Sequence, residues 1–237
     1  MMLPLIYLKI LIKKQSDSGM SLMESLVAIV IISLMAVVTT PPLILAMATR
    51  IQTRRAQTAV TLAQKELERI RLIVDSGDYL NNMLPPVASG GGAAITTPSQ
   101  ISTAGAPNAI LPAPPCAIPE ETCTPYSYNQ AWWVDDSQEY FIQTFRTTGV
   151  QQDNQVVVFR MGIRVYSKVA EADLGSLRTE SAPLYLTRGA GERTVVNRDG
   201  SNISARQRQF PLAVIYADFS RGDLIGSLER YHEFIGD

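Results

Sequence analysis

Apolar residues gather near the start of the chain in one long run. Residues 26–38 read LVAIVIISLMAVV and carry no charge. From Leu22 to Ala48 the only charged side chain is that of Glu24. A helix rises about 1.5 Å per residue, so roughly 20 residues cross the hydrocarbon core of a bilayer. The run therefore predicts a transmembrane helix over residues 22–48.

Beyond this run the helical pattern continues to about Val74, but its character changes. Charged residues return from position 50 onward, and apolar residues recur at three- and four-residue steps, the pattern of a helix with one buried face. The apolar stripe comprises Ile51, Val60, Leu62, Leu67, Ile70 and Ile73. The sequence DSG at residues 75–77 is typical of a helix end. We predict one helix over residues 20–75 whose second half packs against a sheet.

Strand patterns dominate the second half of the chain. Runs of aromatic and β-branched residues favour extended structure, and a turn is predicted at residues 149–154. The strong segments are YSYNQAWWV at 126–134, EYFIQTFRT at 139–147 and QVVVFRMGIRVYS at 155–167; the weaker ones are APLYLTR at 182–188 and PLAVIYADF at 211–219. We expect an antiparallel sheet of four or five strands. Because Trp132 and Trp133 are adjacent in one strand, one ring should face the core and the other should point outward.

The segment between helix and strands, residues 76–125, has no regular pattern. It contains two Pro-Pro pairs, the run Gly90–Gly92 and many Ser, Thr and Ala residues. Such a composition buries little apolar surface, so we predict a long surface loop or a partly disordered linker. The glycines do not form a phosphate-binding loop, because no Gly-Lys-Ser/Thr sequence follows them. The expected fold is α+β, with the sheet domain at residues 126–237.

The residues before the apolar run decide how the helix is interpreted. Residues 3–12, LPLIYLKILI, are similar to the apolar core of a secretory signal peptide, but polar and basic residues follow and no small-residue cleavage site is present. Lysines at positions 9–14 favour a cytoplasmic N-terminal flank, whereas arginines at positions 50–55 oppose that bias. Charge counting alone therefore does not fix the orientation of the helix.

A more specific pattern lies at residues 19–29, which read GMSLMESLVAI. A polar, basic leader ends in Gly19, and an uninterrupted apolar helix with a single carboxylate, that of Glu24, follows directly. This arrangement resembles the type IV prepilin signal, which pilins share with the pseudopilins of type II secretion. Family members usually carry Phe directly after the glycine, where this chain has Met20.

The resemblance implies a pathway of processing and assembly. A membrane peptidase would cut between Gly19 and Met20, remove the leader of residues 1–19 and methylate the new amine of Met20. Glu24 would then pair with an N-terminal amine and set the register of each incoming subunit. The implied partners are other pilins or pseudopilins contacted through the N-terminal helix, the prepilin peptidase and the inner-membrane assembly platform. The implied fold is pilin-like, with the long helix packed on the antiparallel sheet.

A physical argument also indicates a functional role for Glu24, independently of the resemblance to prepilins. A charged carboxylate at the centre of a bilayer costs about 2.5–3.5 kcal/mol, so it needs a partner, and cleavage creates an amine at the same membrane depth. The alternative is a plain membrane anchor whose glutamate lies at the level of the lipid headgroups. Pilin helices also commonly carry a kinking proline a little over twenty residues after the cut, so Pro41 and Pro42 are expected to kink this helix.

The only two cysteines, Cys116 and Cys123, lie in the Pro-rich sequence PAPPCAIPEETCTP. A zinc site would need about four ligands, and a redox motif would need closer spacing. A small disulfide loop in an oxidising compartment fits an exported segment best. Two free thiols in a cytosolic protein are the alternative.

No set of residues points to catalysis. The net charge of −1 gives no overall basic surface for nucleic acid. A nucleophile–base pair would have to use the single histidine, His232. Some pseudopilins hold calcium in a C-terminal loop, but no D-x-[DN]-x-[DN]-G pattern occurs in this chain. We expect no enzymatic activity, no cofactor and no metal.

The expected function is that of a minor pilin-like subunit, or pseudopilin, which assembles into a pilus-like filament of a secretion system. The large domain suits a minor or tip subunit, and the stretch FRMGIRVYS…APLYLTRG resembles the pseudopilin group linked to hormogonium polysaccharide secretion. Two alternatives stay open: a minor pilin of a surface pilus used for motility or adhesion, and a membrane-anchored binding module that never polymerises. We expect a single-pass protein of the inner membrane with its C-terminal domain in the periplasm.

Overall fold

The structure, a computed structural model, describes residues 21–77, 79–115, 124–181, 193–196, 202–205, 207–221 and 227–236. The chain divides into two compact units, with the boundary between Ala48 and Thr49. Helix α1 (Leu22–Ser76) begins in the first unit, and its residues from Thr49 onward belong to the second. All described strands, and the second helix α2 (Ser227–Ile235), belong to the second unit.

A six-stranded sheet forms the framework of the second unit. Its strand order is β10-β7-β5-β4-β3, and β6 also pairs with β7. The bounds are β3 Ala109–Leu111, β4 Gln130–Trp133, β5 Tyr140–Arg146, β6 Val150–Gln152, β7 Gln155–Ser167 and β10 Ala213–Ser220. Neighbouring strands are antiparallel except β3 and β4, which run parallel. The predicted α+β class with a mainly antiparallel sheet is confirmed.

Shorter elements complete the second unit. Two pairs of strands, β1 with β2 and β8 with β9, form separate two-stranded antiparallel sheets. The bounds are β1 Ser89–Gly90, β2 Ala93–Ala94, β8 Arg193–Val196 and β9 Asn202–Ala205, with 3-10 helices η1 Asn81–Met83, η2 Pro98–Thr103, η3 Lys168–Asp173 and η4 Gln207–Gln209.

Two of the three strong strand predictions and one weaker one agree closely with the structure, whereas the strand predicted at 126–134 is shortened to β4, Gln130–Trp133. Strand β7 has the predicted bounds, β5 is one residue shorter at each end, and β10 ends one residue later. The predicted turn before β7 is tighter than expected, because β6 forms a hairpin with β7 through Asp153 and Asn154, whose φ angles are 50° and 65°. Two consecutive residues with positive φ are what a two-residue hairpin loop requires. The weak strand predicted at 182–188 lies outside the described residues.

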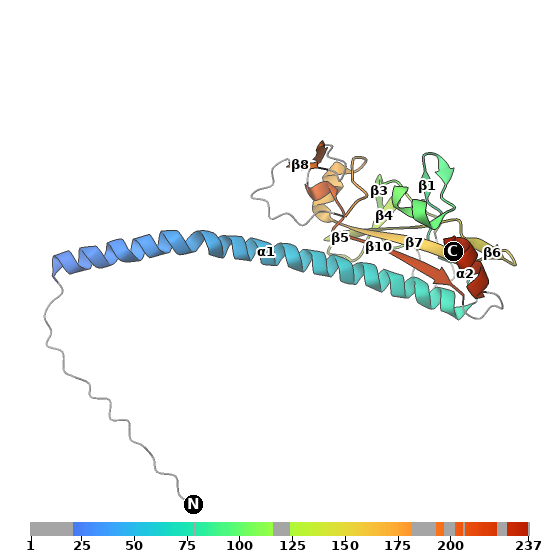
Figure 1. Cartoon of the computed structure of the whole chain (residues 1–237), viewed down its shortest axis with the longest axis horizontal. Coiled ribbons are helices and arrows are strands. Elements are labelled where there is room, and N and C mark those ends of the chain that lie inside the picture. The colour runs from blue at the N-terminus through green and yellow to red at the C-terminus, as the bar shows by residue number, and fades with distance from the viewer. Residues whose placement is uncertain are drawn as a thin grey trace, which may run out of the picture. The chain divides into compact units, whose positions relative to one another are not determined.

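The second half of α1 packs on one face of this sheet (Figure 1). Its buried residues are Ala59, Ala63, Ile70 and Val74, and they contact sheet residues that include Ile142, Met161, Ile163 and Val165. The predicted stripe is therefore partly right: Ile70 is buried, while Leu62, Leu67 and Ile73 are partly buried. Ile51 and Val60 stay exposed, because the buried face follows the small side chains of Ala59 and Ala63 instead.

Helix α1 ends at the place where the sequence predicts a stop. Gly77 has a φ angle of 73°, and its backbone N–H donates to the carbonyl of Val74 at 3.2 Å. A left-handed residue directly after the last turn is a common helix ending, and glycine adopts it without a steric penalty.

The opposite face of the sheet is covered by the segment that the sequence suggested was a loose surface loop. Ile95 and Ile101 are buried there against Phe145 of β5. Arg164 of β7, which is fully buried, donates hydrogen bonds to three carbonyls of this segment, those of Ser102, Ala104 and Gly105, at 3.2, 2.9 and 3.1 Å. The prediction of little buried apolar surface was thus wrong for residues 79–111: Ala88, Ile95, Ile101 and Ala104 pack on this face, and Tyr79 and Leu84 pack on the α1 side.

This second layer also corrects the expectation for the two tryptophans. Trp132 packs on the α1 side of the sheet, and Trp133 packs on the other side against Phe141, with ring centroids 5.5 Å apart. Their exposed fractions are only 3% and 7%. The rings do point to opposite faces, but neither lies on the surface, because both faces of the sheet are covered at β4.

Candidate functional site

The start of α1 is shaped by a local hydrogen-bonding motif. The backbone N–H of Glu24 donates to the hydroxyl of Ser21 at 3.2 Å and to its carbonyl at 2.9 Å. Ser21 therefore caps the helix, because its hydroxyl satisfies one of the N–H groups that have no partner in the first turn. Serine followed by glutamate three residues later is the sequence signature of a capping box. That signature is visible in the sequence and is enough to predict the cap.

The carboxylate of Glu24 has no partner of its own. It is exposed, and within the described residues it forms neither a hydrogen bond nor an ion pair. No other charged residue occurs on α1 until Arg50. A negative charge in the first turn is favoured by the helix dipole, which holds the carboxylate at this end of the helix without neutralising it. The geometry thus presents a single unpaired anion at the start of a long apolar surface.

That apolar surface covers the first nineteen residues of α1. Leu22–Thr40 is long and apolar enough to cross a membrane, and none of it is buried in the structure. The large side chains along it expose roughly half to four-fifths of their surface, for example 49% for Ile31 and 84% for Leu22. This helix is compatible with a single membrane span or with a signal sequence.

The few hydroxyl groups in this segment are satisfied by the helix itself. The hydroxyl of Ser33 donates to the carbonyl of Ile29 at 2.7 Å. Thr39 and Thr40 donate in the same way to the carbonyls of Met35 and Ala36, at 2.9 and 2.6 Å. Polar groups without water must find partners in the protein, and these three have them. These three hydroxyls therefore need no solvent partner.

Several predicted site residues lie beyond what the structure describes. Gly19 and Met20 precede the described residues, and Cys116 and Cys123 lie in the gap at 116–123. Helix α1 runs through Pro41 and Pro42, and the kink stays a prediction.

The residues that flank the cysteine segment are described, and they are close together. The backbone N–H of Thr124 donates to the carbonyl of Pro115 at 2.9 Å, and the Thr124 hydroxyl is 3.2 Å from the same oxygen. A disulfide requires Cα atoms within about 7 Å of each other, and closely held flanks are a precondition for that. The bridge itself stays a prediction.

A polar cluster joins the second half of α1 to the sheet. Arg69 donates to both carboxylate oxygens of Glu66, at 2.9 and 2.5 Å. The hydroxyl of Tyr126 is 2.9 Å from that of Thr144 on β5, and its ring meets Trp132 edge to face. Burial raises the pKa of Tyr126 above its usual value. The ion pair lies within α1, the Tyr126 contacts lie on the sheet side, and Arg69 also lines an open hollow with Gln64 and Leu72.

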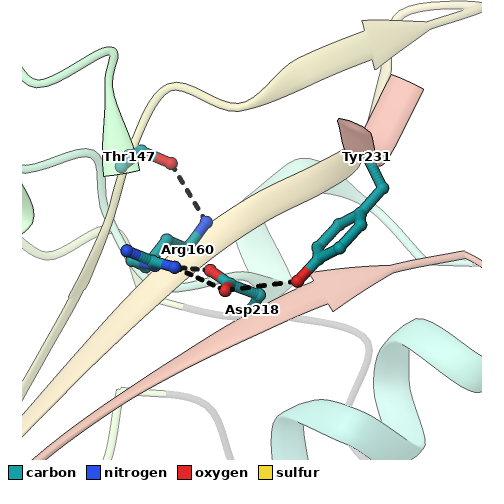
Figure 2. A network of polar contacts seen from close by, with 4 residues as sticks. All are labelled: Thr147, Arg160, Asp218 and Tyr231. Carbon is teal, nitrogen blue, oxygen red and sulfur yellow. Dashed lines mark hydrogen bonds and ion pairs between the residues drawn. The ribbon is translucent and has the colours of Figure 1, made fainter. Parts of the chain in front are cut away.

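A second cluster fastens α2 to the sheet, as Figure 2 shows. Arg160 of β7 donates to both carboxylate oxygens of Asp218 on β10, at 2.5 and 2.6 Å, and the hydrogen bond to Asp218 raises the pKa of Arg160. The hydroxyl of Tyr231 on α2 approaches the same carboxylate at 3.5 Å, and Thr147 accepts the backbone N–H of Arg160 at 3.1 Å. All four groups are engaged with one another, so the cluster is structural.

No metal-binding or catalytic constellation is found in the described part of the chain. Within it, no three His, Cys, Asp or Glu residues are placed to hold a metal ion. His232 lies exposed on α2, where its ring meets Tyr231 at a centroid distance of 6.3 Å.

Comparisons with protein-family models, with curated proteins and with solved structures find no match to this chain. What the structure shows by itself is a pilin-like shape: an apolar N-terminal helix whose second half packs on a mostly antiparallel sheet. The candidate functional site is accordingly the start of α1, with Ser21, Glu24 and the exposed apolar surface from Leu22 to Thr40.

Proposed function

We propose that this chain is a minor pilin-like subunit, a pseudopilin, of a pilus-like filament that serves a secretion system. In this proposal a prepilin peptidase cuts between Gly19 and Met20, and the amine of Met20 becomes methylated. Helix α1 then anchors the subunit in the inner membrane, with the sheet domain in the periplasm. Other pilins or pseudopilins contact it through α1 when the assembly platform adds it to the filament.

One observation carries the proposal. A helix capped by Ser21 begins directly after the glycine of a prepilin-like sequence, and it presents one unpaired carboxylate followed by an exposed apolar surface. Apolar side chains in water are unfavourable at about 25 cal/mol per Å², so this surface requires lipid or other helices around it. A carboxylate in the same surroundings requires a cation.

Cleavage would supply that cation. The amine of Met20 would lie four residues before Glu24, close to the membrane depth of the carboxylate. A charge pair attracts far more strongly at low dielectric than in water, so the carboxylate of an incoming subunit would seek the amine of its neighbour. The pair would fix the axial position of the helix, which apolar contacts alone leave free to slide.

The capping motif also supports a second function, that of a membrane-anchored module that does not polymerise. Serine followed three residues later by glutamate is the capping-box sequence, so a local use of Glu24 at the helix start needs no neighbour, although only its backbone N–H contacts Ser21 among the described residues. The two functions differ in what glutamine would do. Glutamine serves a capping box as well as glutamate does, but it cannot pair with an amine.

Processing is the first test. We expect the full chain, expressed together with a prepilin peptidase, to yield a mature protein that starts at methylated Met20. Gly19→Ala should accumulate as uncut precursor, whereas the neighbouring change Ser18→Ala should be processed normally. Mass spectrometry of the N-terminus is the measurement. A membrane-inserted protein that retains residues 1–19 in its assembled form would rule the proposal out.

A further inference from the structure

Three arginines form a basic collar on α1 at the start of the second unit. Arg50, Arg54 and Arg55 are all exposed. Within the described residues, none of their guanidinium groups forms an ion pair or a side-chain hydrogen bond, whereas Arg69 and Arg71 further along the helix both pair with glutamates. The collar is thus a cluster of positive charge that forms no ion pair within the described residues.

A hollow of about 240 Å³ adjoins the collar and extends it onto the sheet domain. It lies where β5 begins and β7 ends, and the backbone N–H of Lys168 donates to the carbonyl of Glu139 across it at 2.8 Å. Its lining comprises Arg55, Glu139, Tyr140, Ser167, Lys168 and Val169. With two cations and one carboxylate, the lining carries a formal charge of +1. The hollow is therefore large enough for one side chain. Its net positive charge favours the side chain of an aspartate or a glutamate.

The helix itself offers the collar no counter-charge. Between Glu24 and Glu66 the chain contains no acidic residue at all. Residues three or four apart on a helix are neighbours, so an acid at position 51 or 58 would have neutralised the collar. Along this whole stretch, α1 itself supplies the collar with no acidic partner.

We infer that the basic collar, together with the hollow beside Lys168, docks an acidic segment of a different pilin-like subunit. The inference rests on the proposed function and specifies the kind of neighbour that assembly requires. That neighbour carries aspartate or glutamate on its helix at the level of the collar, and one of these acids enters the hollow between Arg55 and Lys168.

A second copy of this chain does not fit the collar. If Glu24 of one copy meets the amine of Met20 of the next, parallel helices are offset by four residues, or about 6 Å. The two collars then lie side by side with like charges opposed. Glu66 is the first acid beyond Arg55, and an offset of eleven residues, about 16 Å, would be needed to bring it there. The charge pattern therefore favours a mixed filament over a pure one.

The test uses the chain as its own acidic partner. Full-length wild-type protein is co-expressed with a second, differently tagged copy, which is either wild type or the reversed triple variant Arg50→Glu, Arg54→Glu, Arg55→Glu. The fraction of the second copy that co-purifies in detergent is measured. We expect the wild-type and reversed chains to associate about ten-fold more than either chain does with itself, the effect of three exposed opposite charges. The difference should disappear in about 0.5 M salt.

A matched control reverses two exposed cations outside the collar. The double variant Lys65→Glu, Arg71→Glu lies on the same helix, and it should show no gain in association with wild type. In the collar-reversed copy, adding Glu139→Gln should leave the mixed association intact. In the wild-type partner, Lys168→Glu should lower it, because the hollow would lose one of its two cations.

Three results would overturn the inference. Equal association in all pairings would mean that the collar faces no neighbouring helix. Stronger association of wild type with itself would mean that a second copy occupies the collar. Equal pairings together with loss of co-purifying phosphatidylglycerol from the reversed variant would assign the collar to lipid headgroups. The N-terminus of each purified chain is determined by mass spectrometry, so a failure of cleavage after Gly19 is detected separately from a failure of the collar to pair.

Discussion

In the first half of α1, Ile29 and Leu34 expose 65% and 68% of their surface, whereas Ile70 in the second half exposes none. These apolar residues have similar size and sit on the same helix. They differ in whether another part of the chain covers the side chain. The sheet of the same chain covers Ile70, and no described residue covers Ile29 or Leu34.

The difference extends to the charges. The second half pairs its glutamates with arginines one turn away, while the first half holds one carboxylate, that of Glu24, which no cation of the described residues approaches. One helix thus joins a first half without partners among the described residues to a second half with apolar and ionic partners in its own domain. The first half is therefore the part of α1 that the described residues leave uncovered, and the second half is the part that packs on its own domain.

The largest difference in stability should appear when one apolar side chain in each half is truncated to alanine. Ile70→Ala leaves a cavity between α1 and the sheet, so it should lower the free energy of unfolding of the sheet domain by about 2–5 kcal/mol. Leu34→Ala removes surface that the domain does not bury, so it should leave that free energy unchanged. Denaturant unfolding of the full chain in detergent, followed by tryptophan fluorescence, is the measurement. Equal losses would erase the distinction between the two halves.

Removing the predicted disulfide should have the next largest effect. Cys116 and Cys123 would close a short loop whose flanks are held by the hydrogen bond between Thr124 and Pro115. Replacing both cysteines by serine should cost the sheet domain about 2 kcal/mol and leave membrane anchoring unchanged. Thiol labelling of the oxidised native protein should detect neither cysteine. Rapid labelling of both would show that the bridge does not exist.

Alkaline pH should weaken only the packed half. Burial raises the pKa of Tyr126 and Tyr166 in the folded state, while the unfolded tyrosine titrates near 10. Their contribution to stability is therefore complete below pH 10 and is lost as the pH rises above it, by roughly 1 kcal/mol per pH unit for each residue. The double variant Tyr126→Phe, Tyr166→Phe should show a shallower loss between pH 10 and 11.

The smallest effect should come from the outermost ion pair of the packed half. Arg71 and Glu68 expose 52% and 58% of their side chains, against 21% and 11% for Arg69 and Glu66. Arg71→Ala should cost under about 0.5 kcal/mol, whereas Arg69→Ala should cost roughly 1–3 kcal/mol because it leaves a largely buried carboxylate unpaired. Thermal unfolding of the two variants side by side makes the comparison. A larger loss for Arg71→Ala would reverse the assignment of the buried face.

Local pattern was enough to predict the elements that make up most of the fold. Strand β7 is a long run of β-branched and aromatic residues, and its bounds were predicted to the residue. The end of α1 was equally readable, because Gly77 marks it. Both signals act over a few neighbouring residues, so no knowledge of the rest of the chain is needed.

Features that depend on distant contacts were missed. Residues 79–111 carry few apolar side chains at irregular spacing, and only the sheet, with Arg164 and Phe145, gives them a place to pack. The buried face of α1 was misjudged at Val60 for a similar reason, since the close approach of the sheet favours the alanines beside it.

The candidate site was predictable to a different degree. The lone Glu24 and the apolar run were evident from composition, and the structure adds the hydrogen bond from the backbone N–H of Glu24 to the hydroxyl of Ser21, which caps the helix. Gly19, Met20 and both cysteines lie outside the described residues, so cleavage, methylation and the disulfide are still predictions.

The central claim is that the charge of Glu24 positions this helix among others, and one substitution tests it with its local role preserved. Glu24→Gln keeps a capping partner for Ser21 but removes the charge. We predict that the variant is processed and membrane-held but reduced at least about a hundred-fold in the sheared filament fraction or secretion complex, since an unpaired member of a buried pair costs about 3–5 kcal/mol. Ser21→Ala, which removes the cap and keeps the charge, should still assemble. Wild-type amounts of Glu24→Gln in the assembled fraction would contradict the account.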